Sequence, residues 1–452
     1  MKTKFEQLCS LLNEKDKAQI FTLIQTRFLG GQDEHTAFFK RVMRERKPFS
    51  KNIPVRERLI MSDLYQMIEK WLVIRLVLKD DNSFDGKLLQ FFRQNENEKL
   101  FREKMADARK KTHIEGIQNS AFYERMGNLL YEQWEFDQLH NRFSNAEAEE
   151  IQRYKEIASI SRQLMETVTL VPQAALISRE IDTSLTDHLM PYVQQKGYLG
   201  IPCIALYYYA LHMIRYPEDE EWFYRFSNEL DQHKQVFPKE ELKTLYFQAI
   251  NYCIRRHNLG DNNYSRRLLE YYKTALQEKY LLTNGYLSRN TYRNINTIAI
   301  RLGYYEEALD LSLSYVDLLR KEDKKSAYNF NMANIFYAQK RYDEAIESLQ
   351  DVEFEDHLSN LFAKTIQLKI YYETGSDRLL DAHLDAMQVY LTRKKIIGYH
   401  KNNYAKIIKF TRKLIRLNPF DQKAKSALLE QIRQEKLIPD REWLLREVEH
   451  KK

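Results

Sequence analysis

A short segment recurs three times in the second half of this chain, and its period constrains the fold more than any other feature. Residues 302–309 read Leu-Gly-Tyr-Tyr-Glu-Glu-Ala-Leu, residues 340–346 read Lys-Arg-Tyr-Asp-Glu-Ala-Ile, and residues 374–380 read Thr-Gly-Ser-Asp-Arg-Leu-Leu. Ala308 and Ala345 lie 37 residues apart, and the third, degenerate copy follows another 35 residues on. Self-similarity at a period of about 20 to 50 residues is typical of repeat proteins, whose units bury their apolar faces against neighbouring units.

The residue types in these copies suit a tight turn between two antiparallel helices. Gly303 and Gly375 stand at the turn, where glycine adopts left-handed backbone angles without steric cost. Ala308 is small and opens the second helix, so the two helices can pack closely. These residues resemble the tetratricopeptide repeat, a helix hairpin with a period of about 34 residues, most clearly over residues 285–390. The resemblance implies an all-α fold, a right-handed α-solenoid of helix hairpins.

A wider resemblance extends over nearly the whole chain. It rests on Asn-Tyr-Cys-Ile-Arg at 251–255, Asn-Gly-Tyr-Leu-Ser at 284–288, Thr-Tyr-Arg-Asn-Ile at 291–295 and Asp-Arg-Glu-Trp-Leu-Leu at 440–445. These strings are similar to those of a bacterial family of uncharacterised helical-repeat proteins. The likeness implies the helical fold and a cytoplasmic setting, and it assigns no activity.

Turn-forming residues are scarce and unevenly placed. The 452 residues include only 12 glycines and 9 prolines, which disfavours β-sandwiches and barrels because these need frequent turns. Five prolines fall between Pro172 and Pro238, and none occurs from Lys239 to Asn418, so long helices can stack there. We therefore predict four parts: a helical N-terminal module at 1–94, charged connecting helices at 95–171, a helical-repeat array at 172–390 and basic C-terminal capping helices at 391–452.

Charge, cysteine and hydropathy describe the setting. The net charge of +7 is a small surplus on 71 basic and 64 acidic residues, so it does not by itself predict a nucleic-acid or membrane partner. Cys9, Cys203 and Cys253 are odd in number and far apart, which indicates reduced thiols. The amphipathic start of the chain is unlike a signal peptide, and the 16 apolar-rich residues of Leu199–Ile214 fall short of the roughly 20 that span a bilayer. We expect a cytoplasmic protein without a membrane partner.

The sequence contains no recognisable catalytic motif. It lacks a phosphate-binding glycine loop, a His-Glu-x-x-His zinc motif and a Gly-x-Ser-x-Gly nucleophile turn. Cys253 and His257 lie one helical turn apart and could share a metal, but no second pair of ligands lies nearby, so core packing is the preferred interpretation. We predict a protein that is not an enzyme and that holds no metal or cofactor.

The candidate site is the polar side of the first helix of each hairpin. In a tetratricopeptide stack these helices line the concave surface, so their polar stripes would adjoin and form a groove. Asparagine amides can pair with a peptide backbone, and arginine can bind carboxylates. We predict that the groove binds a peptide or protein partner through Asn251, Arg255, Asn290, Arg293, Asn294, Phe330, Asn331, Asn334, Tyr337 and Lys369. The competing interpretation, that these are ordinary solvated faces, stays open.

Nucleic-acid binding is the alternative function. Residues 393–416 contain nine Lys or Arg residues and no Asp or Glu, and Lys406, Lys409, Lys413 and Arg416 share one helical face. Such a basic ridge could follow the phosphates of RNA or DNA. It could instead face the acidic segment 343–356 of the same chain or of a second copy, which we prefer, and a homo-oligomer therefore stays open.

Overall fold

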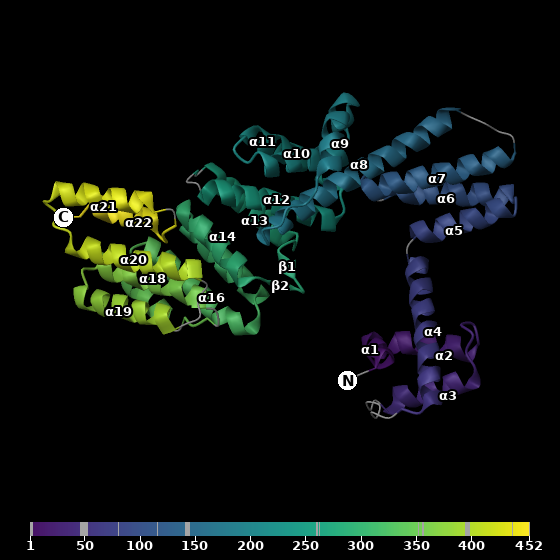
Figure 1. The fold of residues 1–452 in the computed structure, drawn as a ribbon, viewed down its shortest axis with the longest axis horizontal. Coiled ribbons are helices and arrows are strands. Elements are labelled where there is room, and N and C mark those ends of the chain that lie inside the picture. The colour runs from purple at the N-terminus through teal and green to yellow at the C-terminus, as the bar shows by residue number, and fades with distance from the viewer. Residues whose placement is uncertain are drawn as a thin grey trace. The chain divides into compact units, whose positions relative to one another are not determined.

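The computed structural model describes residues 3–45, 53–79, 81–114, 116–140, 145–258, 261, 263–350, 352–354, 357–393, 398–435 and 437–451. Within these residues the chain forms 22 α-helices, three short 3-10 helices and one two-stranded antiparallel hairpin (Figure 1). The prediction of an all-α protein is confirmed. None of the helices in these ranges is both long enough and apolar enough to cross a membrane.

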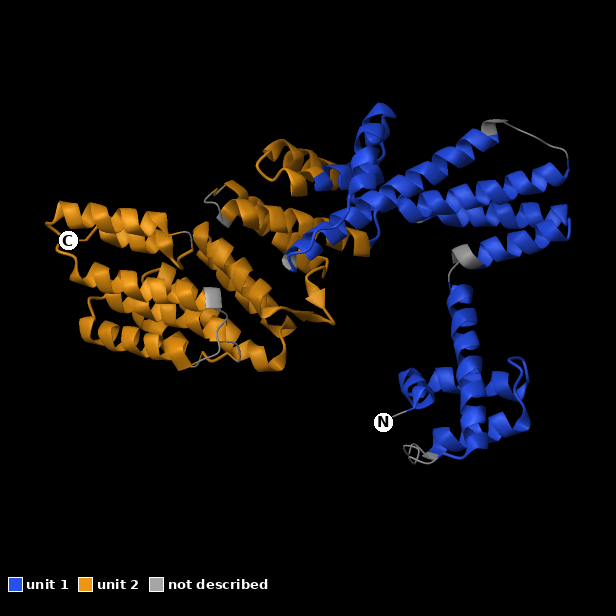
Figure 2. Cartoon of the chain, in the orientation of Figure 1, with its two compact units in different colours: residues 1–211, 231–238 blue, residues 212–230, 239–452 orange. Residues whose placement is uncertain are grey.

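The chain divides into two compact units (Figure 2). Unit 1 comprises residues 1–211 and 231–238, and unit 2 comprises residues 212–230 and 239–452. These units do not test the four-part division predicted above, which stays a prediction.

The helices of the first half are α1 (Lys4–Leu11), α2 (Glu14–Gln25), α3 (Asp33–Glu45), α4 (Val55–Lys79), α5 (Asp81–Gln94), α6 (Glu98–Ile114), α7 (Ser120–Leu139), α8 (Asn145–Leu176), α9 (Ser184–Gln195), η1 (Tyr198–Gly200), α10 (Pro202–Arg215), α11 (Glu220–His233) and η2 (Lys234–Val236). The elements that follow are α12 (Lys239–Asn258), α13 (Asn263–Gln277), β1 (Leu282–Thr283), β2 (Tyr286–Leu287), α14 (Arg289–Arg301), α15 (Tyr305–Tyr315), η3 (Val316–Leu318), α16 (Lys321–Ala338), α17 (Tyr342–Gln350), α18 (His357–Glu373), α19 (Asp377–Arg393), α20 (Gly398–Arg416), α21 (Gln422–Gln434) and α22 (Arg441–Glu449).

Unit 1 begins with helices whose ends are set by local sequence. The Thr3 and Asn13 side chains each accept a hydrogen bond from the backbone amide three residues on. The Glu6 and Asp16 carboxylates accept in turn from the backbone amides of Thr3 and Asn13, so both helices start with a capping box. Helices α1 to α4 bury one apolar core, which contains Ile20, Ile24, Leu64 and Ile68, all at 0% exposure. A second core lies on α5 to α7, where the rings of Phe101 and Phe136 stack.

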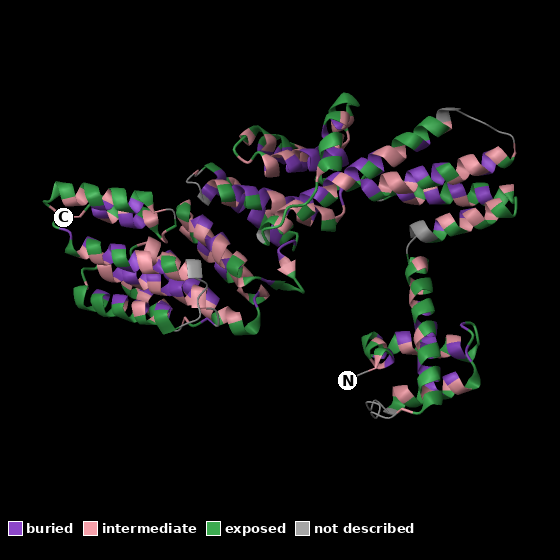
Figure 3. Cartoon of the chain, viewed as in Figure 1, coloured by how far each residue is buried: buried purple, intermediate pink, exposed green. Residues whose placement is uncertain are grey.

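Unit 2 is built from consecutive helix hairpins. Helices α12 and α13, α14 and α15, α16 and α17, and α18 and α19 pack as pairs, and each pair contacts the next. The first helices of neighbouring hairpins also touch, α14 with α16 and α16 with α18. Buried residues recur along each of these helices, between exposed and half-buried ones (Figure 3).

The turn inside each hairpin has the same backbone geometry in the three repeated copies. Gly303, Lys340 and Gly375 all adopt the left-handed conformation, with φ of 78°, 61° and 65°. In each copy the next residue's amide donates to the carbonyl five residues earlier, at 2.8 to 2.9 Å, which closes a Schellman motif. The small residues Ala308 and Ala345 are completely buried, as the predicted close approach of the second helix requires.

The C-terminal helices share a core with the last hairpin. Leu361 and Leu368 of α18, Leu380 of α19, Ile407 of α20 and Leu444 of α22 belong to one apolar cluster and are all at 0% exposure. Helix α22 packs against both α20 and α21. Helix α22 is therefore held to the hairpins through the interior of unit 2.

Candidate functional site

A cavity of about 960 Å³ lies where several helices of unit 2 end. Helices α16, α18, α20 and α22 all place residues of their last turn in its wall. The turns after α16 and α18, the first residues of α17 and α19, and two residues after α22 complete it. The lining residues are Tyr337, Ala338, Lys340, Tyr342, Tyr372, Glu373, Gly375, Asp377, Ile415, Arg446, Glu447, His450 and Lys451. The wall thus combines aromatic rings with charges of both signs.

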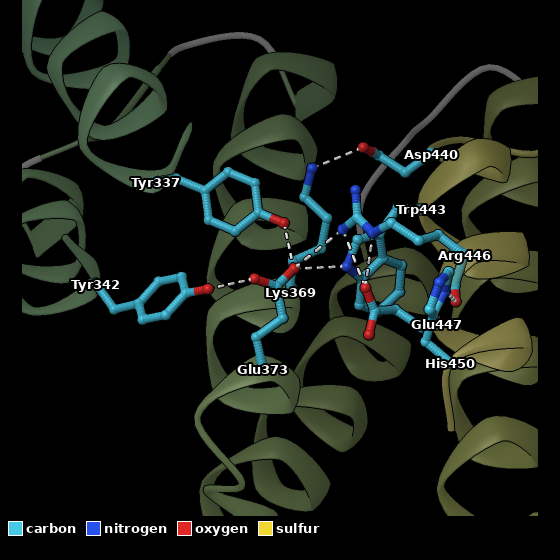
Figure 4. A network of polar contacts seen from close by, with 9 residues as sticks. All are labelled: Tyr337, Tyr342, Lys369, Glu373, Asp440, Trp443, Arg446, Glu447 and His450. Atoms are coloured by element: carbon cyan, nitrogen blue, oxygen red, sulfur yellow. Dashed lines mark hydrogen bonds and ion pairs between the residues drawn. The ribbon is translucent and has the colours of Figure 1, made fainter. Parts of the chain in front are cut away.

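The carboxylate of Glu373 is the centre of this wall (Figure 4). The Tyr337 hydroxyl donates to its Oε1 at 2.5 Å, and the Tyr342 hydroxyl donates to its Oε2 at 2.6 Å. The indole Nε1–H of Trp443 also donates to Oε1, at 2.8 Å. A mostly buried carboxylate needs such donors, since removing it from water without them is costly.

The network joins segments that are far apart in the sequence. Glu373 is the last residue of α18, whereas Trp443 and Arg446 belong to α22, about 70 residues later. One guanidinium nitrogen of Arg446 lies 3.6 Å from Glu373 Oε1. Arg446 also donates to Glu447 Oε1 at 3.0 Å. Burial first, and then the neighbouring Glu373 carboxylate, raise the pKa of both Tyr337 and Tyr342, so these phenols stay protonated as donors.

The electrostatics of the cavity depend on the helix ends as well as on side chains. The lining contains three cationic residues, Lys340, Arg446 and Lys451, and three carboxylates, Glu373, Asp377 and Glu447. Each helix C-terminus adds a partial negative charge of roughly half an electron unit. The Lys451 ammonium already lies at one of these ends, where it donates to the Ile415 carbonyl at 3.3 Å.

Of the ten predicted groove residues, Tyr337 is the one that lines this cavity. Asn251, Arg255 and Asn290 are exposed, and Arg293, Asn294, Asn334 and Lys369 are half-buried. Three of the half-buried side chains have contacts within unit 2. The Arg293 guanidinium lies 4.1 Å from the centroid of the Phe362 ring, Lys369 pairs with Asp440 at 2.7 Å, and the Asn334 amide donates to the Phe330 carbonyl at 3.3 Å. The structure does not bring the ten residues together into one lining.

The prediction that Phe330 and Asn331 line a groove is wrong, because both side chains are in the interior. Phe330 is 5% exposed, and its ring packs edge-on against Phe354. Asn331 is at 0% exposure, and its amide donates to the Ser312 hydroxyl at 3.4 Å and to the Tyr292 carbonyl at 3.5 Å. A polar residue is tolerated in the core when interior acceptors replace water, so the helix face cannot be read from polarity alone.

The basic ridge meets helix α21 in the structure. Lys406 pairs with Glu435 at 2.6 Å, and Lys413 donates to Gln431 Oε1 at 2.5 Å. Lys409 and Arg416 are exposed. Glu435 and Gln431 do not belong to the acidic segment 343–356, of which residues 351, 355 and 356 lie outside the described residues.

Apolar residues and one threonine form the buried side of the same helix. Tyr404, Ile407, Ile408, Thr411 and Leu414 are all buried. Ile415 is half-buried instead, because it reaches the cavity wall.

Cys253 and His257 are both buried in unit 2. The His257 Nδ1 lies 2.8 Å from the Ser265 hydroxyl, and burial raises the pKa of the Cys253 thiol to about 12. Across the ranges that the structure describes, no three His, Cys, Asp or Glu side chains gather as a metal site would require.

The cavity is a site that the sequence did not predict, apart from Tyr337. Glu373 and Arg446 belong to no motif described above, and Trp443 lies in the string at 440–445, to which the resemblance assigns no role. The chain matches no protein-family model, and it matches no curated protein in sequence.

Proposed function

We propose that unit 2 is a right-handed α-solenoid of tetratricopeptide-like hairpins that binds a peptide segment of a partner protein without catalysing a reaction. The observation that carries this proposal is the cavity beside Glu373. Its volume of about 960 Å³ lies within the range of roughly 300 to 1,000 Å³ that is usual for ligand sites.

The lining suits a peptide because it offers both apolar and polar contacts. Tyr337, Tyr342 and Tyr372 supply ring faces, and tyrosine loses little conformational entropy on binding. The hydrogen bonds to Glu373 hold two of these rings in place before any ligand arrives. A site that is preorganised in this way binds more tightly, because less ordering remains to be done.

The test fills the cavity by a single substitution. Ala338 lines the wall at the end of α16, so Ala338→Trp would occupy part of the space and leave Glu373 and its three donors unsubstituted. Leu313→Trp is the matched control, since Leu313 is 53% exposed on α15 and does not line the cavity. Both variants should keep the far-UV circular dichroism of the natural chain.

Binding is measured with peptides selected from a random phage-displayed library on the immobilised full chain. We expect Ala338→Trp to weaken the selected peptides by about tenfold or more, equal to about 1.4 kcal/mol, while Leu313→Trp binds them normally. Peptides that bind Ala338→Trp as tightly as the natural chain would place the site elsewhere and refute the proposal.

Nucleic-acid binding is the second candidate, and it is supported by the exposure of Lys409 and Lys413 on α20. It requires that the affinity for single-stranded RNA fall steeply with salt concentration, because phosphate contacts release counterions. It also requires that Lys409→Gln combined with Lys413→Gln reduce that affinity and the salt slope. The peptide proposal expects neither effect.

A further inference from the structure

We infer that the cavity beside Glu373 binds the cationic side chain of a lysine or arginine in the partner peptide, and that Lys451 of this chain occupies the same position when no partner is bound. The inference rests on the proposed function, whose cavity it takes as the binding site. It names the chemistry of the ligand and a built-in competitor.

The position of Lys451 is the first observation. This residue follows α22 near the end of the chain, yet it is half-buried in the cavity wall. Its ammonium donates to the Ile415 carbonyl in the last turn of α20 and lies 5.6 Å from the centroid of the Tyr372 ring. A carbonyl at a helix C-terminus and a tyrosine face within about 6 Å both favour a cation.

The charge balance of the wall is the second observation. Without Lys451, the described lining has two cations, Lys340 and Arg446, against the three carboxylates of Glu373, Asp377 and Glu447. Arg446 is already engaged with Glu447 and lies near Glu373. Four helix C-termini in the wall, each with a partial negative charge, outnumber the two helix N-termini there, those of α17 at Tyr342 and α19 at Asp377. The helix dipoles therefore add to this deficit, and the wall without Lys451 attracts a positive group.

The same unit holds a second ammonium in a similar manner, and this is the third observation. Lys369 pairs with Asp440 at 2.7 Å while its Nζ lies 4.7 Å from the centroid of the Tyr337 ring. Tyr337 also lines the cavity. Two lysines of this chain thus use the same combination of a tyrosine face and an oxygen acceptor, which guanidinium and ammonium groups of a peptide can use as well.

A competitor inside the chain has a measurable consequence. The apparent affinity of a ligand falls in proportion to the fraction of protein in which its position is free. Lys451→Ala removes the internal ammonium and leaves every carboxylate and ring in place, so it should increase the affinity for a cationic peptide. Asp377→Lys should have the opposite effect, because it adds a positive charge to the wall.

The probes are fluorescein-labelled octapeptides that alternate glycine with lysine, arginine, norleucine or glutamate, titrated with the full chain by fluorescence anisotropy at 150 mM salt. We expect the lysine and arginine peptides to bind about tenfold more tightly than the norleucine peptide. We expect Lys451→Ala to tighten them by about threefold or more and Asp377→Lys to weaken them by about tenfold. Glu306→Lys is the matched control, since Glu306 is also an exposed acidic residue in a first helical turn but lies outside the cavity.

The outcomes separate this inference from the proposed function. Equal affinity for the lysine, norleucine and glutamate peptides would overturn the inference, as would a Lys451→Ala chain that binds as the natural one does. If selected library peptides still lose binding on Ala338→Trp, the proposed function survives that result. If Ala338→Trp has no effect on any peptide, the proposed function fails with it.

Discussion

The substitution Glu373→Ala tests whether the network beside the cavity holds helix α22 in place. Three donors contact the carboxylate, and they differ in their access to water. Tyr337 and Tyr342 line the cavity, so water can replace the lost acceptor for both hydroxyls. Trp443 is 4% exposed and does not line the cavity, so its indole N–H would lose its acceptor in a buried position.

The expected magnitude follows from that single donor. A hydrogen bond to a charged group contributes about 1.5 to 3 kcal/mol, and a stranded buried donor costs a similar amount. Arg446 is 56% exposed and 3.6 Å from Glu373, so its loss adds little. We expect α22 to be about 2 kcal/mol less stable against local opening, which equals an increase of about 30-fold in amide exchange.

Hydrogen exchange followed by mass spectrometry measures this directly, on peptic fragments that cover residues 440–451. Tyr342→Phe is the matched control, because it removes one donor at the wet side and should change exchange by threefold or less. Fragments from α12 and α13 should exchange at the natural rate in both variants. Unchanged exchange of α22 in Glu373→Ala, or an equal change in Tyr342→Phe, would refute the reasoning.

Two further predictions concern buried titratable groups. Burial raises the pKa of the Cys9 and Cys253 thiols to about 12, and all three cysteines are buried, so Ellman's reagent should label the chain only after denaturant is added; rapid labelling of the native chain would contradict this. Burial first, then the Lys364 charge, lowers the pKa of His383 from its usual 6.5, against the opposing effect of the hydrogen bond to the Lys364 carbonyl. The stability that neutral His383 contributes is therefore complete above pH 6.5 and is lost as the pH falls through the lowered pKa. The urea midpoint of the natural chain should fall more on acidification than that of His383→Gln, and parallel falls would exclude this role.

The helical fold of unit 2 follows from features that the sequence displays locally. The turn glycines Gly303 and Gly375 and the small Ala308 and Ala345 each meet a steric requirement of the hairpin, so their positions mark the turns and the second helices. Lys340 takes the same left-handed conformation without being glycine. Its role could be inferred only from the alignment of the three copies, since lysine has no preference for that conformation.

The positions of the prolines predicted the helix ends less well than the turn glycines did. Pro172 lies inside α8, which continues to Leu176, and Pro191 lies inside α9. Proline removes one backbone donor and bends a helix, but packing on either side can keep the helix continuous. The expected boundary at residue 172 therefore does not coincide with the end of a helix.

The cavity could not be predicted from the repeats, because a repeat pattern describes contacts between neighbouring units. Glu373 and Trp443 belong to helices that three other helices, α19, α20 and α21, separate along the chain. Nothing in the residues around either one marks the partner, and an acidic residue at a helix end is commonly solvated. At Asn331 the polar side chain predicted an exposed position, but the residue is buried.

The location of the cavity has a physical cause that does not depend on particular side chains. In a series of antiparallel hairpins, every first helix runs in the same direction, so the carboxyl ends of α16, α18 and α20 fall on one side of the stack. The helix dipoles give each of these ends a partial negative charge, and α22 adds a fourth end, while the N-termini of α17 and α19 on the same side offset part of this negative potential. The cations at this side, Lys340, Arg446 and Lys451, compensate part of that potential, and all three follow from the final turn of a helix or the residues just after it. Lys340 lies in the turn after α16 and Arg446 lies within α22, whereas Lys451 lies beyond the last turn of α22, so Lys451 is the cation that the proposed exchange would replace.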